Sequence, residues 1–302
     1  MGKNINTHNC RLLIPRFLMI TIMTITLFIA PFDGVYCKKA LAEDTDFNDL
    51  KNRLAKDGFD IQTINSIYDK PSVLFETKGV SLFFVHSEGK LDYDQFLSKK
   101  SINSAKQYLK SHAGDLENAQ KIYGVDKTII TAIILVETRL GTYIGNRKVI
   151  NTLSTMAALS DPAKREILWR SLPDDRKMEK SAFEKKADKK SAWAYEELKA
   201  LLRFTSKEGV DPVSIKGSYA GAMGISQFMP SNVLTLAKDG NGDGKIDLFT
   251  HADAIHSIAN YLKNYGWEPS INRQKAHKVL YQYNHSNFYV DTLLKISDRL
   301  KD

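Results

Sequence analysis

The sequence predicts a mainly α-helical protein with one small β element. Apolar residues recur at helical spacing through most of the chain, beginning with Phe47, Leu50 and Leu54. Only residues 72–90 have the composition of a β region. No internal repeat or low-complexity linker divides the chain, so we expect residues 43–302 to form one mainly helical unit.

The helices can be placed in order along the chain. Gly58 is expected to end the first one, and a short hairpin around Gly79 is expected in the β-like stretch. Helical spacing resumes over Ser101–Tyr123. Asp126 follows a turn and is expected to cap the next helix, which contains the apolar run of residues 129–136.

The stretch Asp174–Lys199 is rich in charges of both signs. We expect a pair of solvated helices here, the second packed inward through Trp193, Leu198, Leu201 and Leu202. The alternative is a role in docking an acidic polymer. The formal net charge of +8 suits an anionic polymer surface, but no basic stripe with interleaved aromatics points to nucleic acid.

Residues 1–42 have the pattern of a secretory signal segment. Basic residues begin the chain, and Phe17–Ala30 is an uncharged run of fourteen residues, which is short for a membrane span. Cleavage is expected after Cys37 or after Ala42. We therefore predict export to the periplasm or the cell envelope, with the functional region in residues 43–302.

The chain has two cysteines, Cys10 and Cys37, both in or beside the signal segment. The mature protein is therefore expected to contain no disulfide of its own. Cys37 could be a lipid-attachment cysteine, but the bulky Tyr36 before it fits that role poorly. A lipid anchor is the less favoured alternative.

Glu137 is an unusual carboxylate, because it follows an apolar run. In a helix, Ile133 and Ile134 would lie on the same apolar face as Glu137. Burial disfavours ionisation, so we expect a raised pKa for Glu137 and a protonated carboxyl near neutral pH. Such a group in a cleft can donate a proton to a glycosidic oxygen. The alternative is a helix-end pair with Arg139 or Lys148.

Residues 216–231 read KGSYAGAMGISQFMPS. The glycines allow a close backbone approach, Ser218 and Gln227 supply hydrogen-bonding side chains, and Met223 and Phe228 supply apolar surface. Sugar binding uses such a mixture, whereas tight packing between elements is the alternative explanation. The segment lacks the spacing of a phosphate loop.

A loop that begins at Asp239 matches the start of an EF-hand calcium site. Asp239, Asn241 and Asp243 are oxygen donors at loop positions 1, 3 and 5, and glycine follows at position 6. Thr250 replaces the usual glutamate at position 12, although Asp253 could close a longer loop. The alternative is a metal-free turn.

Tyr281–Ser286 concentrates aromatic and amide side chains after a short helix. Stacking on a sugar ring together with an amide hydrogen bond would use these groups. A capped helix end would explain them equally well, and the residues alone leave both alternatives open.

Taken together, these segments resemble the membrane-bound lytic transglycosylase B family of bacterial murein-cleaving enzymes. The resemblance runs from about residue 46 to the end of the chain. It rests on motifs that occur in order, namely Tyr123-Gly124-Val125, Val136-Glu137-Thr138-Arg139 with Gly141, Gly217–Gly224 with Gln227–Ser231, the Asp239 loop and Tyr283-Asn284. It implies a lysozyme-like helical core with an additional helical lobe, a structural Ca²⁺ and no organic cofactor.

The resemblance also implies cleavage of the β-1,4 bond between N-acetylmuramic acid and N-acetylglucosamine. Glu137 matches the family's single catalytic acid, which protonates the leaving oxygen and then acts as a base. The motifs contain no obvious second carboxylate, which a retaining or inverting hydrolase would need. In the family's chemistry the muramyl 6-hydroxyl attacks the anomeric carbon and leaves a 1,6-anhydro end.

Further site residues follow from the same resemblance. The positions that line the family's sugar cleft match Tyr93, Ser218, Gln227, Tyr261, Tyr283 and Asn284. The family's calcium loop is longer than an EF-hand and its last ligand falls on Asp253, so the implied metal residues are Asp239, Asn241, Asp243, Lys245 and Asp253.

The implied partners are peptidoglycan glycan strands and proteins of cell-wall synthesis or division, with no nucleic acid. Two other functions stay open, a non-catalytic peptidoglycan-binding scaffold and a muramidase that uses water. The charged segment Asp174–Lys190 is longer than is usual in the family, and the family's common lipid anchor is not clearly encoded.

Overall fold

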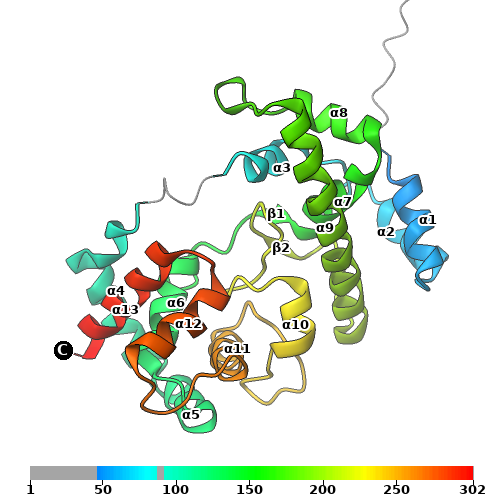
Figure 1. The fold of residues 1–302 in the computed structure, drawn as a ribbon. Coiled ribbons are helices and arrows are strands. Elements are labelled where there is room, and N and C mark those ends of the chain that lie inside the picture. Colours follow the sequence, from blue (N-terminus) through cyan, green and yellow to red (C-terminus); the bar gives the residue numbers. More distant parts are fainter. Residues whose placement is uncertain (1–45, 87–91, 302) are drawn as a thin grey trace, which may run out of the picture. The chain divides into compact units, whose positions relative to one another are not determined.

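The computed structural model describes residues 46–86 and 92–301 (Figure 1). The predicted signal segment 1–42, with its cleavage sites and the possible lipid attachment at Cys37, lies outside these residues. Within the described ranges, no helix is both long enough and apolar enough to span a membrane.

Helices make up most of the described chain, which confirms the predicted mainly α class. The α-helices are α1 (Asn48–Lys56), α2 (Ile61–Tyr68), α3 (Thr77–Phe84), α4 (Lys99–Ser111), α5 (Ala113–Tyr123), α6 (Lys127–Thr138), α7 (Val149–Ala157), α8 (Pro162–Arg170), α9 (Lys180–Glu208), α10 (Pro230–Leu236), α11 (His251–Asn264), α12 (Arg273–Tyr283) and α13 (Asn287–Lys301). Short 3-10 helices are η2 (Asp94–Leu97), η3 (Ala158–Ser160) and η4 (Asp174–Arg176), and the strands are β1 (Arg147–Lys148) and β2 (Lys216–Gly217).

The helices pack in two groups, which can be followed in Figure 1. In one group, α7 packs against α9 and α3, and α8 packs against the same two helices. In the other group, α6 packs against α4, α5, α11 and α13. The short helix α10 contacts both α9 and α11, so it connects the two groups.

The small β element is present, but at a different place from the predicted one. Strands β1 and β2 form a two-stranded antiparallel sheet in which Arg147 lies opposite Gly217. This sheet joins the end of the loop after α6 to the start of the glycine-rich segment 216–231. It therefore fixes where that segment begins.

The predicted hairpin around Gly79 is wrong, because this stretch forms the helix α3. A side-chain oxygen of Glu76 accepts the N–H of Gly79 at 2.9 Å and caps the helix. Val80 and Phe84 lie one turn apart on α3 and are both buried. The tertiary burial of this helical face outweighs the local β propensity of the sequence.

Helix α9 runs unbroken from Lys180 to Glu208, so the predicted pair of helices is wrong. No glycine or proline interrupts it. Its buried residues recur at helical spacing along one face, for example Phe183, Ala187, Ala194, Leu198 and Leu201. The helix packs against α7, α10, η3 and α8. Leu198, Leu201 and Leu202 pack inward as predicted, whereas Trp193 is half-buried.

Two other predictions about helix ends are confirmed. Gly58 follows α1 with a left-handed backbone, at φ +88°. The predicted helical stretch Ser101–Tyr123 is helical, although it divides at His112 into α4 and α5.

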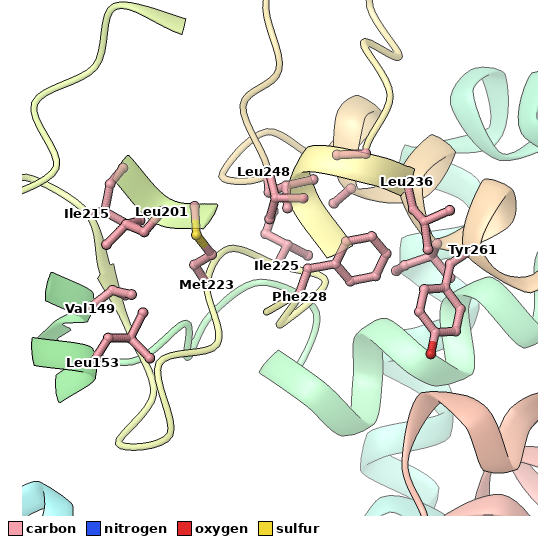
Figure 2. Packing of buried hydrophobic residues seen from close by; sticks show 14 of the residues in the cluster. Val149, Leu153, Leu201, Ile215, Met223, Ile225, Phe228, Leu236, Leu248 and Tyr261 are labelled. Atoms are coloured by element: carbon pink, nitrogen blue, oxygen red, sulfur yellow. The ribbon is translucent and has the colours of Figure 1, made fainter. Parts of the chain in front are cut away.

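The glycine-rich segment carries part of the protein core. Its side chains Met223, Ile225 and Phe228 are buried. Figure 2 shows them between two sets of core side chains, with Val149, Leu153, Leu201 and Ile215 on one side and Leu236 and Tyr261 on the other. The packing explanation for this segment is therefore correct for its apolar residues, and it leaves the polar residues to be considered at the site.

Candidate active site

Helix α6 gives Glu137 a rigid base. Asp126 caps the helix as predicted, because its Oδ1 accepts the N–H of Thr128 at 3.0 Å. The middle of the helix is enclosed by other elements, and Ile130 and Ile133 are fully buried. Glu137 lies in the last turn and is half-buried, so part of it remains accessible at the end of a helix whose middle is buried.

The backbone beyond Glu137 turns sharply. Arg139 and Leu140 adopt left-handed conformations at φ 50° and 62°, which are unfavourable for side-chain-bearing residues. The hydroxyl of Thr138 accepts the N–H of Gly141 at 3.0 Å. Its one hydrogen is shared between the carbonyl oxygens of Ile225 at 3.1 Å and Ile134 at 3.2 Å. Thr138 thus ties the end of α6 to the glycine-rich segment.

A tyrosine that the sequence motifs did not single out holds the carboxylate of Glu137. The hydroxyl of Tyr289 in α13 donates to Oε1 of Glu137 at 2.6 Å. Tyr289 is 1% exposed. Burial raises the pKa of Tyr289 well above its usual value, and the nearby charge of Glu137 raises it further. The phenol therefore keeps its proton and remains a donor to the carboxylate.

Three predicted cleft tyrosines extend from Tyr289. The ring of Tyr283 stacks with that of Tyr289 at a centroid separation of 6.5 Å, and Tyr93 meets Tyr289 edge-on at 6.4 Å. Tyr261 meets Tyr283 edge-on at 4.9 Å. Burial raises the pKa of Tyr283, and the charge of Glu137 adds to this effect. The structure thus brings Tyr93, Tyr261 and Tyr283 together in one aromatic cluster beside Glu137.

The cations proposed as alternative partners of Glu137 make other contacts. Arg139 donates through Nη2 to Oε1 of Gln95 at 2.6 Å. Lys148 donates through Nζ to the carbonyl oxygen of Val213 at 3.0 Å. These contacts show where one donor group of each cation lies, and the catalytic role of Glu137 stays a prediction.

The hydroxyls of two cluster tyrosines are committed to backbone oxygens. Tyr283 donates to the carbonyl of Ser226 at 2.5 Å, and Tyr261 donates to the carbonyl of Gln282 at 2.6 Å. The first bond attaches the glycine-rich segment to the end of α12, and the second attaches α11 to the same place. Asn284 is the C-terminal cap of α12, directly after Tyr283. The capped helix end is therefore present, and the sugar contact of the Tyr281–Ser286 motif stays a prediction.

Ser218 and Gln227 lie at two turns of the glycine-rich segment. The hydroxyl oxygen of Ser218 accepts the N–H groups of Ala220 and Ala222 at 3.2 and 3.1 Å, which leaves its hydrogen to donate elsewhere. Gln227 has a left-handed backbone at φ 49°, and its Nε2 donates to Gly224 at 2.9 Å. Both side chains are half-buried.

The Asp239 loop is organised by its own carboxylates. Oδ1 and Oδ2 of Asp239 accept the N–H groups of Gly242 and Gly244 at 2.6 and 2.8 Å. Asp253 accepts the N–H groups of Gly240 and Asp247 at 2.9 and 2.7 Å. The loop is thus closed by Asp253 from α11, as the longer-loop alternative requires.

The buried position of Asp253 tests whether the loop suits a cation. Asp253 is 1% exposed; this burial raises its pKa, and the charge of Asp239 contributes to the rise. In the described ranges no three Asp, Glu, His or Cys side chains lie together at metal-ligand separation. The oxygen donors and the poorly solvated charge of Asp253 nevertheless match the chemistry that a hard cation prefers.

Comparison with known families decides the relationship. The model of the Transglycosylase SLT domain family matches residues 42–276. The chain belongs to this family. Membrane-bound lytic murein transglycosylase B of Escherichia coli (strain K12) is 32% identical to it over 173 residues, which are 57% of this chain and 40% of that protein. The aligned part thus spans less than half of that relative's length.

Several solved structures share the fold. Soluble lytic transglycosylase SltB1 from Pseudomonas aeruginosa superposes with a TM-score of 0.68 at 23% identity, covering 84% of this chain and 97% of that one. Escherichia coli Slt35 in complex with calcium superposes with a TM-score of 0.65 at 22% identity, covering 84% of this chain and 92% of that one. Pseudomonas aeruginosa SltB3 in complex with NAG-NAM-pentapeptide superposes with a TM-score of 0.65 at 19% identity, covering 85% of this chain and 80% of that one. The predicted family and its lysozyme-like helical fold are confirmed.

Tyr289 is the site residue that the sequence motifs missed. Within α13 it belongs to an apolar pattern with Val290, Leu293 and Leu294, which reads as ordinary core. The only local signal is its position six residues after Tyr283. Its role emerges from the packing of α13 against α6, which no local pattern reveals.

Proposed function

We propose that this protein is a peptidoglycan lytic transglycosylase with Glu137 as its single general acid and base. The bond cleaved is the β-1,4 bond between N-acetylmuramic acid and N-acetylglucosamine. The observation that carries the proposal is the hydrogen bond from Tyr289 to Glu137, because it fixes a half-buried carboxyl group at the end of a rigid helix. Membership of the Transglycosylase SLT domain family supports it.

The reaction needs one carboxyl group in two protonation states. Glu137 first donates its proton to the glycosidic oxygen, and the bond from that oxygen to the muramyl anomeric carbon breaks. The Glu137 carboxylate then removes the proton of the muramyl 6-hydroxyl, whose oxygen bonds to the anomeric carbon. Glu137 ends protonated as it began, the product carries a 1,6-anhydro end, and no water is consumed. Tyr289 holds one carboxylate oxygen throughout.

The predicted cleft residues would then divide into two kinds of sugar contact. The hydroxyl hydrogens of Tyr261 and Tyr283 are used within the protein. We propose that the half-buried Tyr283 and Tyr93 offer ring surface to the sugar. Tyr261 is 4% exposed, so its proposed contribution is to support the ring of Tyr283 from within the protein. Ser218, Gln227 and Asn284 would supply hydrogen bonds to the sugar. This division fits carbohydrate sites, which combine an apolar floor with a few polar groups.

Ca²⁺ is proposed as a structural ion of the Asp239 loop. Asp239, Asn241, Asp243, Lys245 and Asp253 would hold it, with Lys245 contributing its backbone carbonyl. When bound, the ion supplies positive charge to the buried Asp253. The structure of Slt35 in complex with calcium supports this proposal at the level of the shared fold.

Export through residues 1–42 and action in the periplasm or cell envelope complete the proposal. Proteins of cell-wall synthesis or division stay expected partners. The test of function is digestion of purified sacculi with the parent protein and with Glu137→Gln. The variant keeps an oxygen that accepts the Tyr289 hydroxyl, so it should bind sacculi without releasing soluble muropeptides. Binding without cleavage by the parent would instead indicate a scaffold.

A further inference from the structure

Three aromatic rings and two lysines form a cluster beside the proposed sugar site, here called the aromatic–lysine cluster. It consists of Phe83 on α3, Trp193, Lys186 and Lys190 on α9, and Tyr219 in the glycine-rich segment. Phe83 stacks with Trp193 at 6.2 Å and an interplanar angle of 20°, and it lies 6.2 Å from the ring of Tyr219. All three rings are half-buried, so part of each faces solvent.

Lys190 adds positive charge next to two of these rings, and Lys186 adds it at Phe84, the residue after Phe83. Nζ of Lys190 lies 4.6 Å from the ring centre of Phe83 and 4.8 Å from that of Trp193. Nζ of Lys186 donates to the carbonyl oxygen of Phe84 at 2.6 Å. Burial lowers the pKa of both lysines, and the charge of Lys186 lowers the pKa of Lys190 further. Each ammonium group is therefore poorly solvated, and the two repel each other.

No acidic side chain in the described ranges forms an ion pair with Lys186 or Lys190. Their acidic neighbours on α9, Glu184 and Asp188, pair with Arg165 instead. Among the residues that the structure describes, the cluster thus combines positive charge that no carboxylate pairs with and aromatic surface, which suits an anionic ligand that also carries a ring or an apolar part.

The position of the cluster selects the ligand. Tyr219 directly follows Ser218, a proposed sugar contact, in the same turn of the glycine-rich segment. In a glycan strand of N-acetylated sugars, the lactyl carboxyl group of muramic acid is uncharged where an amide bond joins it to a peptide, so the negative charges of a peptide-bearing strand are carboxylates on the peptides. We infer that the aromatic–lysine cluster binds the anionic peptide stem of a muramyl residue, with Lys186 and Lys190 facing its carboxylates. This inference rests on the proposed function and gives the charged segment of α9 a specific role.

The test compares glycan strands that carry peptides with strands from which an amidase has removed them. Because amidase cleavage leaves a lactyl carboxylate on each muramyl residue, these carboxylates are converted to primary amides in the peptide-free strands. The test variant is Lys186→Gln with Lys190→Gln. Its control is Lys185→Gln with Lys189→Gln, because these lysines are exposed on the same helix and the net charge changes equally. For the test variant, kcat/KM on peptide-bearing strands should fall about tenfold, mainly through KM, since a lost charge pair of this kind weakens binding by that order.

On peptide-free strands the test variant should match the parent, and the control should match it on both substrates. A variant in which both positions become arginine should retain most of the activity. Equal losses on both substrates would overturn the inference, because the lysines would then serve the sugar backbone or the fold. Unchanged turnover of peptide-bearing strands would overturn it as well.

A binding measurement separates this inference from the proposed function. Calorimetry on a Glu137→Gln background would use the disaccharide N-acetylglucosaminyl-N-acetylmuramyl, either with a pentapeptide or with its lactyl carboxyl group converted to the primary amide, so that cleavage is not required. Adding the two lysine substitutions should weaken pentapeptide binding about tenfold and leave the peptide-free disaccharide unaffected. A parent protein that cleaves no strand would refute the proposed function. Weaker pentapeptide binding on adding the lysine substitutions would still support the inference. Equal binding of the pentapeptide with and without the lysines would refute the inference alone.

Discussion

The hydroxyl of Tyr289 donates a 2.6 Å hydrogen bond to Oε1 of Glu137 across a separation of 152 residues. The two residues lie on α13 and α6, which pack against each other. The bond fixes the direction of the carboxyl group, and the raised pKa of Tyr289 keeps the donor proton in place. Tyr289 is thus a positioning residue for the proposed acid and base.

Tyr289→Phe should lower kcat about 10- to 100-fold with little change in KM, because a hydrogen bond to a charged group contributes about 1.5–3 kcal/mol. Steady-state kinetics on isolated glycan strands measures both constants. The matched control is Tyr143→Phe, since Tyr143 is 71% exposed. Full kcat in Tyr289→Phe would show that the phenol does not position Glu137.

Asp126→Ala should lower the free energy of unfolding by about 1 kcal/mol at pH 7, the usual loss for an N-cap. Burial alone would raise the pKa of Asp126, but Lys301 and Thr128 lower it overall. A lowered folded-state pKa stabilises the protein above the ordinary value of 3.8 and loses that effect as pH falls through the folded value. Urea titrations should therefore show that the difference in unfolding free energy between the variant and the parent becomes smaller as the pH falls below 3.8. Asp175→Ala, at an exposed site, should unfold with the same free energy as the parent. A difference for Asp126→Ala that does not change with pH would contradict the claim that the ionised carboxylate of Asp126 stabilises the folded protein.

Thr138→Val should destabilise the protein by about 1–3 kcal/mol, because it leaves the N–H of Gly141 without its side-chain acceptor and removes a donor to Ile225. It should also reduce turnover by loosening the glycine-rich segment at the site. Thr131→Val is the matched control, since the Thr131 hydroxyl donates within α6 only, to Lys127. Equal denaturation midpoints for the two variants would contradict a special role for the Thr138 link.

Ca²⁺ at a hundredfold excess over its dissociation constant should stabilise the protein by about 2.7 kcal/mol, and a chelator should reverse the effect. Differential scanning calorimetry measures the shift in Tm. Asp243→Ala should abolish the shift, whereas Asp298→Ala, in an exposed pair with Arg273, should retain it. A parent protein whose Tm ignores Ca²⁺ would refute the proposed metal site.

The sequence predicts those parts of the structure that depend on local patterns. Asp126 followed by an apolar run specifies α6 and its cap, because capping and helical periodicity act within one or two turns. Residues 77–84 are different, since their aromatic and β-branched composition favours a strand locally. Burial of Val80 and Phe84 against the rest of the protein stabilises a helix there instead.

The site is predictable only in part, for the same reason. Glu137 and Ser218 belong to short motifs, so a pattern reveals them. The contact between Tyr289 and Glu137, and the meeting of Phe83 with Trp193, join segments far apart in the sequence. Such contacts arise from helix packing, and no local spacing encodes them.

The most direct test of the central claim is digestion of purified sacculi in water enriched in ¹⁸O, followed by mass spectrometry of the released muropeptides. Intramolecular attack by the muramyl 6-hydroxyl predicts 1,6-anhydro ends without ¹⁸O from the parent protein, and no release from Glu137→Gln. Reducing ends that carry one ¹⁸O atom would mean that water is the nucleophile, and would contradict the proposal that Glu137 works alone with a nucleophile supplied by the substrate.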